Sequence, residues 1–272
     1  MRTLSLYLIA CTILIGARAR AQPAIPPAVM QVAKAQITRG AIEAPIRFLA
    51  SDALEGRGPA TRGDALARLY LATELEQLGY QPAGPNGQWQ QPFDLVGIKT
   101  EAPPLWHFGP VGSGVDFKWS DDYIGSSGVQ SPATSIDDAE VVFVGYGIQA
   151  PEYKWDDFKG AKLENKVLLV LNSDPDWDDQ LFAGKTRLYY GRWTYKYESA
   201  AKQKAAAAII IHTTPSAGYP WQVVQSSWSG EQFELPAESE ARLKFRAWAT
   251  EAAARKLVQA SGHNLDELIS AA

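Results

Sequence analysis

Cysteine is almost absent from this sequence of 272 residues, which contains one, Cys11. Cys11 lies in the apolar run Leu4–Gly16, which follows Arg2 and precedes the small residues of Ala19-Arg20-Ala21. A basic start, a short apolar run and a small-x-small site are typical of a signal peptide, so we predict export and cleavage after residue 21. The mature chain would contain no cysteine, which excludes disulfides and thiol chemistry and suits a periplasmic or extracellular protein that relies on its core.

Long apolar runs are also missing. The N-terminal run is shorter than the roughly 20 residues that a membrane span needs, and no later stretch is long enough, so we predict no membrane span. Leu8-Ile9-Ala10-Cys11 also fits a lipoprotein cleavage box, which leaves a lipid anchor on Cys11 as an alternative. That box lies very early, and the apolar run continues past it.

Basic residues are not in excess. The sequence has 26 basic and 30 acidic residues, and cleavage after residue 21 would remove three arginines and no acid, leaving a net charge of −7. Because binding to nucleic acid usually needs a basic face, we predict no nucleic-acid partner. The roughly 250 mature residues suffice for one large domain or two ordinary ones.

Histidine is scarce, and the three histidines, His107, His212 and His263, stand far apart. None has a second histidine or a carboxylate at metal-ligand spacing on one helix face or strand. Asp266 and Glu267 follow His263, but acids at the start of a helix offset its dipole and need no metal. We therefore predict no metal site and no cofactor in this chain.

Catalytic and ligand motifs are equally sparse. The acidic stretch 174–179 has carboxylates at the spacing that calcium uses but lacks the features of an EF-hand, so we expect a solvated loop, with calcium as the alternative. The glycine-rich stretch 56–64 follows no strand, which favours a tight connection between helices over a phosphate loop. No nucleophile elbow is present, and carboxylate pairs of the glycosidase kind stay open, so no catalytic residue is predicted.

Apolar periodicity predicts an α/β chain. Helical spacing covers 29–50, with Pro45 starting a second helix there, and 63–78, where Gly79 follows as a cap. Three short β-branched runs predict buried strands at 140–144, 166–172 and 208–212, and a helix over 198–206 between the last two predicts a βαβ crossover. Further strands are expected at 90–99 and 105–108, a helix at 239–260 and a short helix at 264–269.

Aromatic residues concentrate in the stretch Leu188-Tyr-Tyr-Gly-Arg-Trp-Thr-Tyr-Lys-Tyr197. Its rings and basic residues would suit stacking against sugar rings or peptide aromatics. The same stretch leads into an alanine-rich helix that must pack on a strand, and Trp193 and Tyr197 lie one helical turn apart. Composition leaves both interpretations open: packing in the core, or a surface that faces a ligand.

Several segments resemble one known family. Phe48-Leu-Ala-Ser-Asp-Ala-Leu-Glu-Gly-Arg57 and the helix after it resemble the N-terminal segment of zinc-dependent aminopeptidases, in the superfamily that includes glutamate carboxypeptidase and the transferrin receptor. The segments 142–148, 151–158, 160–171 and 189–198, with Ala217-Gly-Tyr-Pro-Trp221, resemble its protease-associated domain. The resemblance covers most of residues 40–262, and the aromatic stretch is its most specific part.

The resemblance implies a domain order and a fold. It implies a signal peptide over 1–21, the helical and strand segment of an incomplete α/β peptidase domain over 22–112, and a small β-rich protease-associated domain with a βαβ unit over 113–262. Residues 263–272 would begin the return to the peptidase domain. That domain would hold two zinc ions in the complete family member, but no His-x-Asp segment of the family's kind stands in this sequence, so no catalytic or metal residue transfers to it.

Two functional hypotheses follow. The favoured one is an N-terminal fragment of an exported zinc metallopeptidase, inactive alone, whose partners are a missing C-terminal peptidase domain and a peptide substrate. The second is a non-catalytic peptide- or protein-binding module, and sugar binding by the aromatic stretch is a weaker third. The candidates for the substrate cleft are Tyr190, Arg192, Trp193 and Tyr195.

Overall fold

The computed structural model describes residues 25–272, and the predicted signal peptide over 1–21 lies outside them. The chain divides into two compact units, Met1–Gln91, described from residue 25, and Pro92–Ala272. We call them the N-terminal unit and the C-terminal unit. Among the helices of residues 25–272, none combines the length and the apolar character needed to cross a bilayer.

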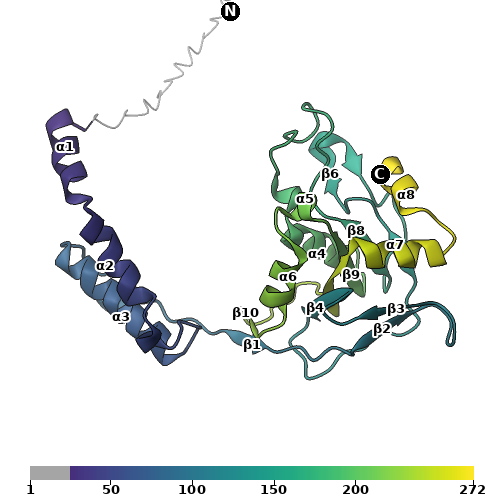
Figure 1. Ribbon diagram of the computed structural model, residues 1–272, viewed down its shortest axis with the longest axis horizontal. Coiled ribbons are helices and arrows are strands. Elements are labelled where there is room, and N and C mark those ends of the chain that lie inside the picture. Colours follow the sequence, from purple (N-terminus) through teal and green to yellow (C-terminus); the bar gives the residue numbers. More distant parts are fainter. Residues whose placement is uncertain (1–24) are drawn as a thin grey trace, which may run out of the picture. The chain divides into compact units, whose positions relative to one another are not determined.

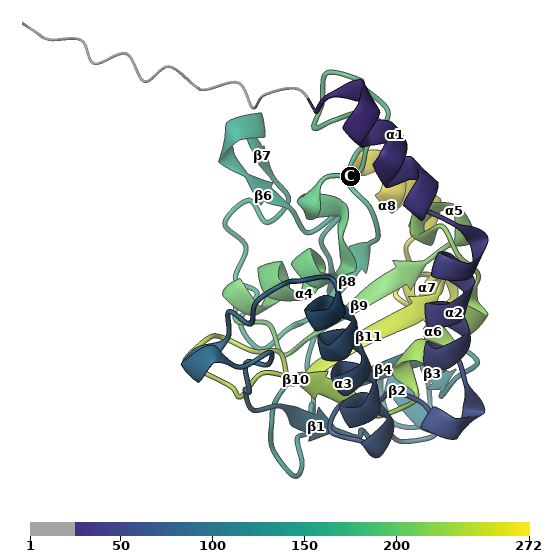
Figure 2. The same ribbon diagram turned by 90° about the vertical axis from the view of Figure 1, so that its left-hand side faces the viewer.

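The N-terminal unit consists of helices. They are α1 (Pro27–Gln36), α2 (Arg39–Leu49) and α3 (Arg62–Gln77), with 3-10 turns at Asp52–Leu54 and Pro85–Gly87. Figure 2 shows α2 beside α3, where the rings of Phe48 and Tyr70 stack with centroids 4.4 Å apart. Many of the larger apolar side chains of this unit are exposed, among them Ile46 and Leu69.

The expectation that Pro45 starts the second helix is wrong. α2 begins at Arg39, because the hydroxyl of Thr38 accepts a hydrogen bond of 3.1 Å from the main-chain N–H of Ala41 and so caps the helix. Pro45 lies inside α2, where its missing N–H leaves one helical hydrogen bond unmade.

The glycine-rich stretch connects two helical segments tightly, as predicted. Thr61 caps α3 by accepting a hydrogen bond of 3.2 Å from the N–H of Asp64. A Cβ at Gly63 would lie 1.8 Å from the carbonyl oxygen of Gly56, so only glycine lets the first turn of α3 approach this loop so closely.

The C-terminal unit is α/β and contains a five-stranded sheet in the order β4-β11-β9-β8-β5. Its strands are β4 (Tyr123–Ser127), β11 (Phe245–Thr250), β9 (Ala207–His212), β8 (Val167–Leu171) and β5 (Val141–Phe143). Neighbouring strands from β5 to β11 run parallel, and β4 joins the edge antiparallel to β11. Helix α4 (Trp193–Lys202) connects β8 to β9, which confirms the predicted βαβ unit, although α4 starts earlier than the expected 198.

Three two-stranded pairings surround this sheet: β1 with β10, β2 with β3, and β6 with β7. Their bounds are β1 (Val96–Ile98), β10 (Gln232–Glu234), β2 (Leu105–Phe108), β3 (Val115–Lys118), β6 (Gln149–Ala150) and β7 (Trp155–Asp156). The remaining elements are 3-10 turns at Pro151–Tyr153 and Tyr189–Gly191, and helices α5 (Thr214–Ala217), α6 (Trp221–Trp228), α7 (Glu251–Ala260) and α8 (Leu265–Ala271). The β2–β3 pairing spans residue 112, where the sequence suggested a boundary.

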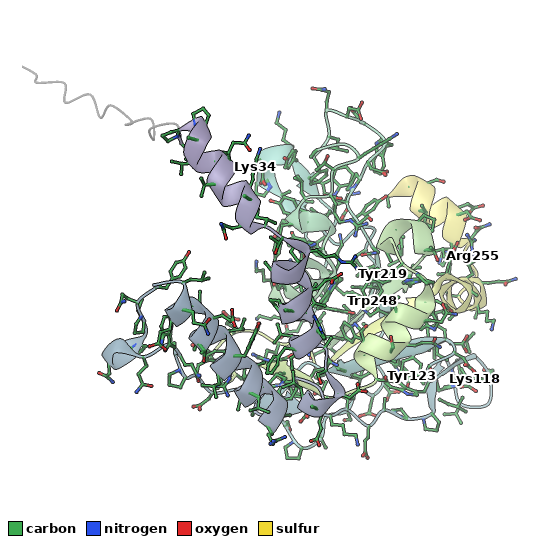
Figure 3. All side chains as sticks on the ribbon, turned by 60° about the vertical axis from the view of Figure 1, so that its left-hand side comes forward. Lys34, Lys118, Tyr123, Tyr219, Trp248 and Arg255 are labelled. Carbon is green, nitrogen blue, oxygen red and sulfur yellow. The ribbon has the colours of Figure 1, made fainter. Side chains whose placement is uncertain are left out.

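Both faces of the sheet are covered (Figure 1). On one face, alternate residues such as Leu169 and Ile209 pack with β2, β3, α7 and α8. On the other face, neighbours such as Leu168 and Ile210 pack with α4 and α6. Figure 3 labels Trp248, which is 1% exposed and belongs to this second face. Because both faces are buried, the strands read as continuous apolar runs.

The predicted helix over 239–260 is wrong in its first half. Residues Phe245–Thr250 form β11, paired on one side with β9 and on the other with β4, and only Glu251–Ala260 are helical. Ala247 and Trp248 face opposite sides of the sheet, which is the alternation of a strand. The alanines of this segment suit a helix by propensity, and the two neighbouring strands override that preference.

Candidate functional site

A pocket of about 370 Å³ lies at the carboxyl ends of β8 and β9. In open α/β sheets, ligands commonly bind beyond the carboxyl ends of parallel strands, where the loops leave the sheet. The lining is polar and includes Asn172, Ser173, Asp174, Arg187, Thr213 and Ser216. We call it the carboxyl-edge pocket.

Hydrogen bonds join its walls. The guanidinium of Arg187 donates to the hydroxyl of Ser173 over 2.8 Å and also to the main-chain carbonyl of Ser216. The amide of Asn172 donates to the same carbonyl over 3.0 Å. The loop after β8, helix α5 and the segment before α4 are therefore tied together.

Asp174 differs from the expectation of a solvated loop. It is 4% exposed, and its carboxylate accepts a hydrogen bond of 2.9 Å from the N–H of Leu188. A Cβ at Gly191 would lie 2.5 Å from the same carboxylate, so the glycine makes room for it. The residues from Asp176 to Asp179 are exposed, as expected.

Lys196 does not line the pocket but contacts Tyr146, which does. This side chain on α4 is 1% exposed, and its ammonium donates a hydrogen bond of 2.7 Å to the main-chain carbonyl of Tyr146. Burial lowers the pKa of Lys196 to about 7, although the carboxylates of Asp174 and Asp157 act in the opposite direction. A buried lysine with so low a pKa marks a candidate functional position.

Asp157 forms the other acidic neighbour of this lysine. Its carboxylate accepts hydrogen bonds of 2.9 Å from the N–H of Ile148 and from the indole N–H of Trp155. Burial raises the pKa of Asp157 despite these bonds. The carboxylate thereby fixes the loop between β5 and β6 against β7.

Sequence reasoning missed this arrangement of Lys196, Asp157 and Asp174. It treated the lysine as part of a basic and aromatic stretch and Asp174 as a member of a solvated loop, and it named Asp157 only within the segment 151–158 of the resemblance. A signal was present: Lys196 shares a helix face with Ser199 and Ala200, and that face packs on a buried strand. The hydroxyl of Ser199 donates to the carbonyl of Gly147 over 2.8 Å, beside the acceptor of Lys196.

The four candidates for a substrate cleft divide between two surroundings. Tyr190 and Tyr195 belong to one aromatic cluster, with ring centroids 5.0 Å apart; Tyr195 is buried and Tyr190 is partly buried. Trp193 is 40% exposed and packs edge-on against Trp228 of α6. Arg192 is exposed at the start of α4. The structure does not bring the four together in one surface, and their role in binding stays a prediction.

The histidines do not converge. His107 contacts the carboxylate of Asp116 over 2.7 Å, a hydrogen bond that raises its pKa, and His212 contacts the carbonyl of Tyr219 over 3.1 Å. Within residues 25–272, no three side chains of His, Cys, Asp and Glu gather closely enough to hold a metal ion. The described residues therefore do not fit the two zinc ions that the resemblance implies for a complete family member.

The chain was also compared with protein families, curated proteins and solved structures. No protein-family model matches the sequence, and a search of curated proteins found no match. Among solved structures, the chain is similar to an aminopeptidase from Aneurinibacillus sp. strain AM-1, with 18% sequence identity and a TM-score of 0.32. That match covers 84% of this chain and 40% of the aminopeptidase, so the chain spans about two fifths of its length.

Proposed function

We propose that this chain is the substrate-flanking part of an exported zinc exopeptidase of the aminopeptidase kind. The supporting observation is that the separate segments on which the resemblance rests meet at one place. From the aromatic stretch, Tyr190 donates to Glu152, and Tyr195 accepts a hydrogen bond of 3.2 Å from the N–H of Gln149. Lys196 reaches Tyr146 in the same way.

These contacts give the resemblance a physical basis. The aromatic segment 189–198 is distant in the sequence from the adjoining segments 142–148 and 151–158, and it hydrogen-bonds to both, through Lys196 to Tyr146 and through Tyr190 to Glu152. We infer that the cluster is part of the framework of a protease-associated domain, and that the carboxyl-edge pocket faces the substrate in the complete enzyme.

The chain is proposed to be inactive by itself. Peptide hydrolysis by zinc needs a bound metal that activates water and polarises the scissile carbonyl. Because the described residues do not fit such a site, we assign the zinc ligands and the general base to a C-terminal peptidase domain supplied from outside this chain. We assign no catalytic step to residues 25–272.

The test is an aminopeptidase assay on purified residues 22–272, with zinc added and with zinc removed by a chelator. We expect no zinc-dependent release of amino acids from peptide or arylamide substrates. Zinc-dependent turnover by this chain would refute the proposal. The reading frame beyond codon 272 provides a second test, since the proposal expects it to encode a His-x-Asp segment followed by further acids and a histidine.

Exposed aromatic rings favour a second candidate, a peptide- or protein-binding module without catalysis. Trp177 is 61% exposed, Tyr189 is 55% exposed and Trp193 is 40% exposed. This module would be supported if residues 22–272 bind peptides and if Trp193→Ala weakens that binding. The same binding measurement on Tyr190→Ala and Arg192→Ala tests whether these two candidates also contact the peptide. An unrelated sequence beyond codon 272 would favour it over the fragment.

A further inference from the structure

Two buried side chains of the carboxyl-edge pocket each keep an oxygen without a hydrogen-bond donor. Asp174 is 4% exposed and Asn172 is 6% exposed, and both line the pocket. Oδ2 of Asp174 accepts the N–H of Leu188, and the amide nitrogen of Asn172 donates to the carbonyl of Ser216. Among residues 25–272, no donor reaches Oδ1 of either side chain. Neither oxygen belongs to the fully buried unpartnered atoms of these residues, so both can accept from a group inside the pocket.

The charge of Asp174 is also unpaired. Within the described part of the chain, no ion pair of 4.0 Å or less includes Asp174 or the two basic lining residues, Lys185 and Arg187. Lys196 attracts Asp174 only from beyond that distance and gives its hydrogen bond to Tyr146. Since a buried carboxylate without a close cation is costly, the two free oxygens favour a ligand with a charged N–H donor, such as an ammonium.

The same pocket offers unused donors. Nη2 of Arg187 donates to Ser173 and Ser216, whereas its Nε and Nη1 donate to no group of residues 25–272. Lys185 is exposed, and its ammonium likewise has no acceptor among these residues. A guanidinium and an ammonium suit a carboxylate, which accepts on two oxygens. The pocket can therefore bind a negative group as well as a positive one.

Gly191 shows that the acceptor and the basic side chain lie close together. The Cβ that this glycine lacks would be 2.5 Å from Oδ1 of Asp174 and 2.6 Å from Cγ of Arg187. The carboxylate and the arginine side chain therefore flank one point. A ligand that pairs with both must also carry its two charges close together. An α-amino acid does so, because one carbon separates its ammonium from its carboxylate.

Tyr146 gives the pocket an apolar wall. It is partly buried and lines the pocket, and the ring of Trp177, which is 61% exposed, has its centroid 6.0 Å from that of Tyr146. An aromatic or large aliphatic side chain would lose apolar surface to water-free contact with these rings. The pocket volume of about 370 Å³ has room for an amino acid of this size.

We propose that the carboxyl-edge pocket binds a free α-amino acid with an aromatic or large aliphatic side chain. Its ammonium donates to Oδ1 of Asp174 and Oδ1 of Asn172, and its carboxylate accepts from Arg187 and Lys185. The inference rests on the proposed function only in that a free amino acid is what an exopeptidase releases. The binding needs neither zinc nor a peptidase domain, so this chain alone suffices to measure it.

The first test compares L-phenylalanine with three analogues by isothermal titration calorimetry on residues 22–272. N-acetyl-L-phenylalanine lacks the ammonium, L-phenylalaninamide lacks the carboxylate, and glycine lacks the side chain. We expect L-phenylalanine to bind with a Kd of about 10 μM to 1 mM, the range for a ligand of this size. Each analogue should bind about tenfold more weakly, because each lacks one set of contacts. The proposal is overturned if L-phenylalanine shows no binding up to about 10 mM, or if both charge-blocked analogues bind equally well.

Variants of the lining test the assignment of the two charges. Asp174→Asn should raise the Kd for L-phenylalanine about tenfold, whereas Asp121→Asn, at an exposed position outside the pocket, should bind like the wild type. Lys185→Gln, at an exposed position, changes no core residue and should weaken binding of L-phenylalanine but not of L-phenylalaninamide. Circular dichroism checks that each variant is folded. Folded Asp174→Asn and Lys185→Gln variants that both bind L-phenylalanine like the wild type would refute the site.

Failure of this site is distinguishable from failure of the proposed function. The aminopeptidase assay and the reading frame beyond codon 272 decide whether the chain is part of an exopeptidase, and neither depends on what the pocket binds. Calorimetry decides the ligand of the pocket without any peptidase activity.

Discussion

The buried hydroxyl of Tyr197, on α4, donates a hydrogen bond of 2.8 Å to the main-chain carbonyl of Ala247, on β11. The two residues lie 50 positions apart in the sequence, and the bond joins the helix of the βαβ unit to a strand two places from β8. It places one ring of the aromatic stretch firmly in the core. The stretch is therefore partly structural.

Removing this hydroxyl should destabilise the C-terminal unit. Tyr197→Phe keeps the ring and deletes the donor, so we expect the free energy of unfolding to fall by about 1 kcal/mol, measured by urea denaturation. Tyr189→Phe is the matched control, because its hydroxyl donates to Glu198 at an exposed position. Equal effects of the two substitutions would contradict the buried role of Tyr197.

Gly191 should tolerate no side chain. A Cβ there would meet the carboxylate of Asp174 at 2.5 Å and the Cγ of Arg187 at 2.6 Å. We expect Gly191→Ala to lower the free energy of unfolding by about 1–3 kcal/mol and to disturb the carboxyl-edge pocket. Gly230→Ala serves as the control, since its Cβ would enter open space. A neutral Gly191→Ala would show that this approach is not required.

The stability of the protein should rise between pH 7 and pH 9 because of Lys196. The pKa of this group is about 7 in the folded protein and near its ordinary 10.5 when unfolded, so the unfolded chain binds more protons in that window. Stability then increases with pH, by up to about 1.4 kcal/mol per pH unit. Lys196→Met should remove this increase in denaturation curves recorded at several pH values.

Two tyrosines, Tyr123 (buried) and Tyr146 (partly buried), limit that window on its basic side. Burial raises the pKa of Tyr123 and Tyr146 to about 12. Since both stay protonated in the folded protein where the unfolded chain loses protons, they reduce stability as pH rises beyond about 10. The prediction for Lys196 would be contradicted if the free energy of unfolding of the wild type stayed constant from pH 7 to 9 and followed the same pH dependence as that of Lys196→Met.

Glu234 should be the central carboxylate of a small ion-pair network. It contacts Arg242 over 2.8 Å and Arg246 over 2.5 Å. Burial would raise the pKa of Glu234, but the two arginines outweigh it and hold the pKa below 4.5. A lowered carboxylate pKa contributes stability that is present above pH 4.5 and is lost as the pH falls through the folded value.

Glu234→Gln should therefore lower the free energy of unfolding by about 1–3 kcal/mol at pH 7, because it leaves two partly buried arginines without a charged partner. The loss should shrink as the pH is lowered below 4.5. Glu238→Gln, at an exposed position a few residues after Glu234, should change stability by less than about 0.5 kcal/mol. Thermal or urea unfolding at pH 7 and pH 4 distinguishes the two.

Local sequence patterns predicted much of the C-terminal unit. The β-branched runs of β5, β8 and β9 are short, apolar and bounded by polar residues, and this pattern depends on neighbours within a few positions. The connection before α3 was equally predictable, since its glycines and Thr61 act locally. Such features are determined by the sequence itself because each depends on backbone conformation and periodicity near the residue concerned.

Tertiary structure alone decided the remaining features. Residues 245–250 became a strand because β4 and β9 offered hydrogen-bond partners on both sides, which no window of sequence reveals. Lys196 became a buried charge because Tyr146, Asp157 and Asp174 arrive from distant loops to surround it. The sequence determined which residues have ionisable or hydrogen-bonding side chains. Long-range packing determined which of these side chains lose contact with water, and burial then shifts their pKa values.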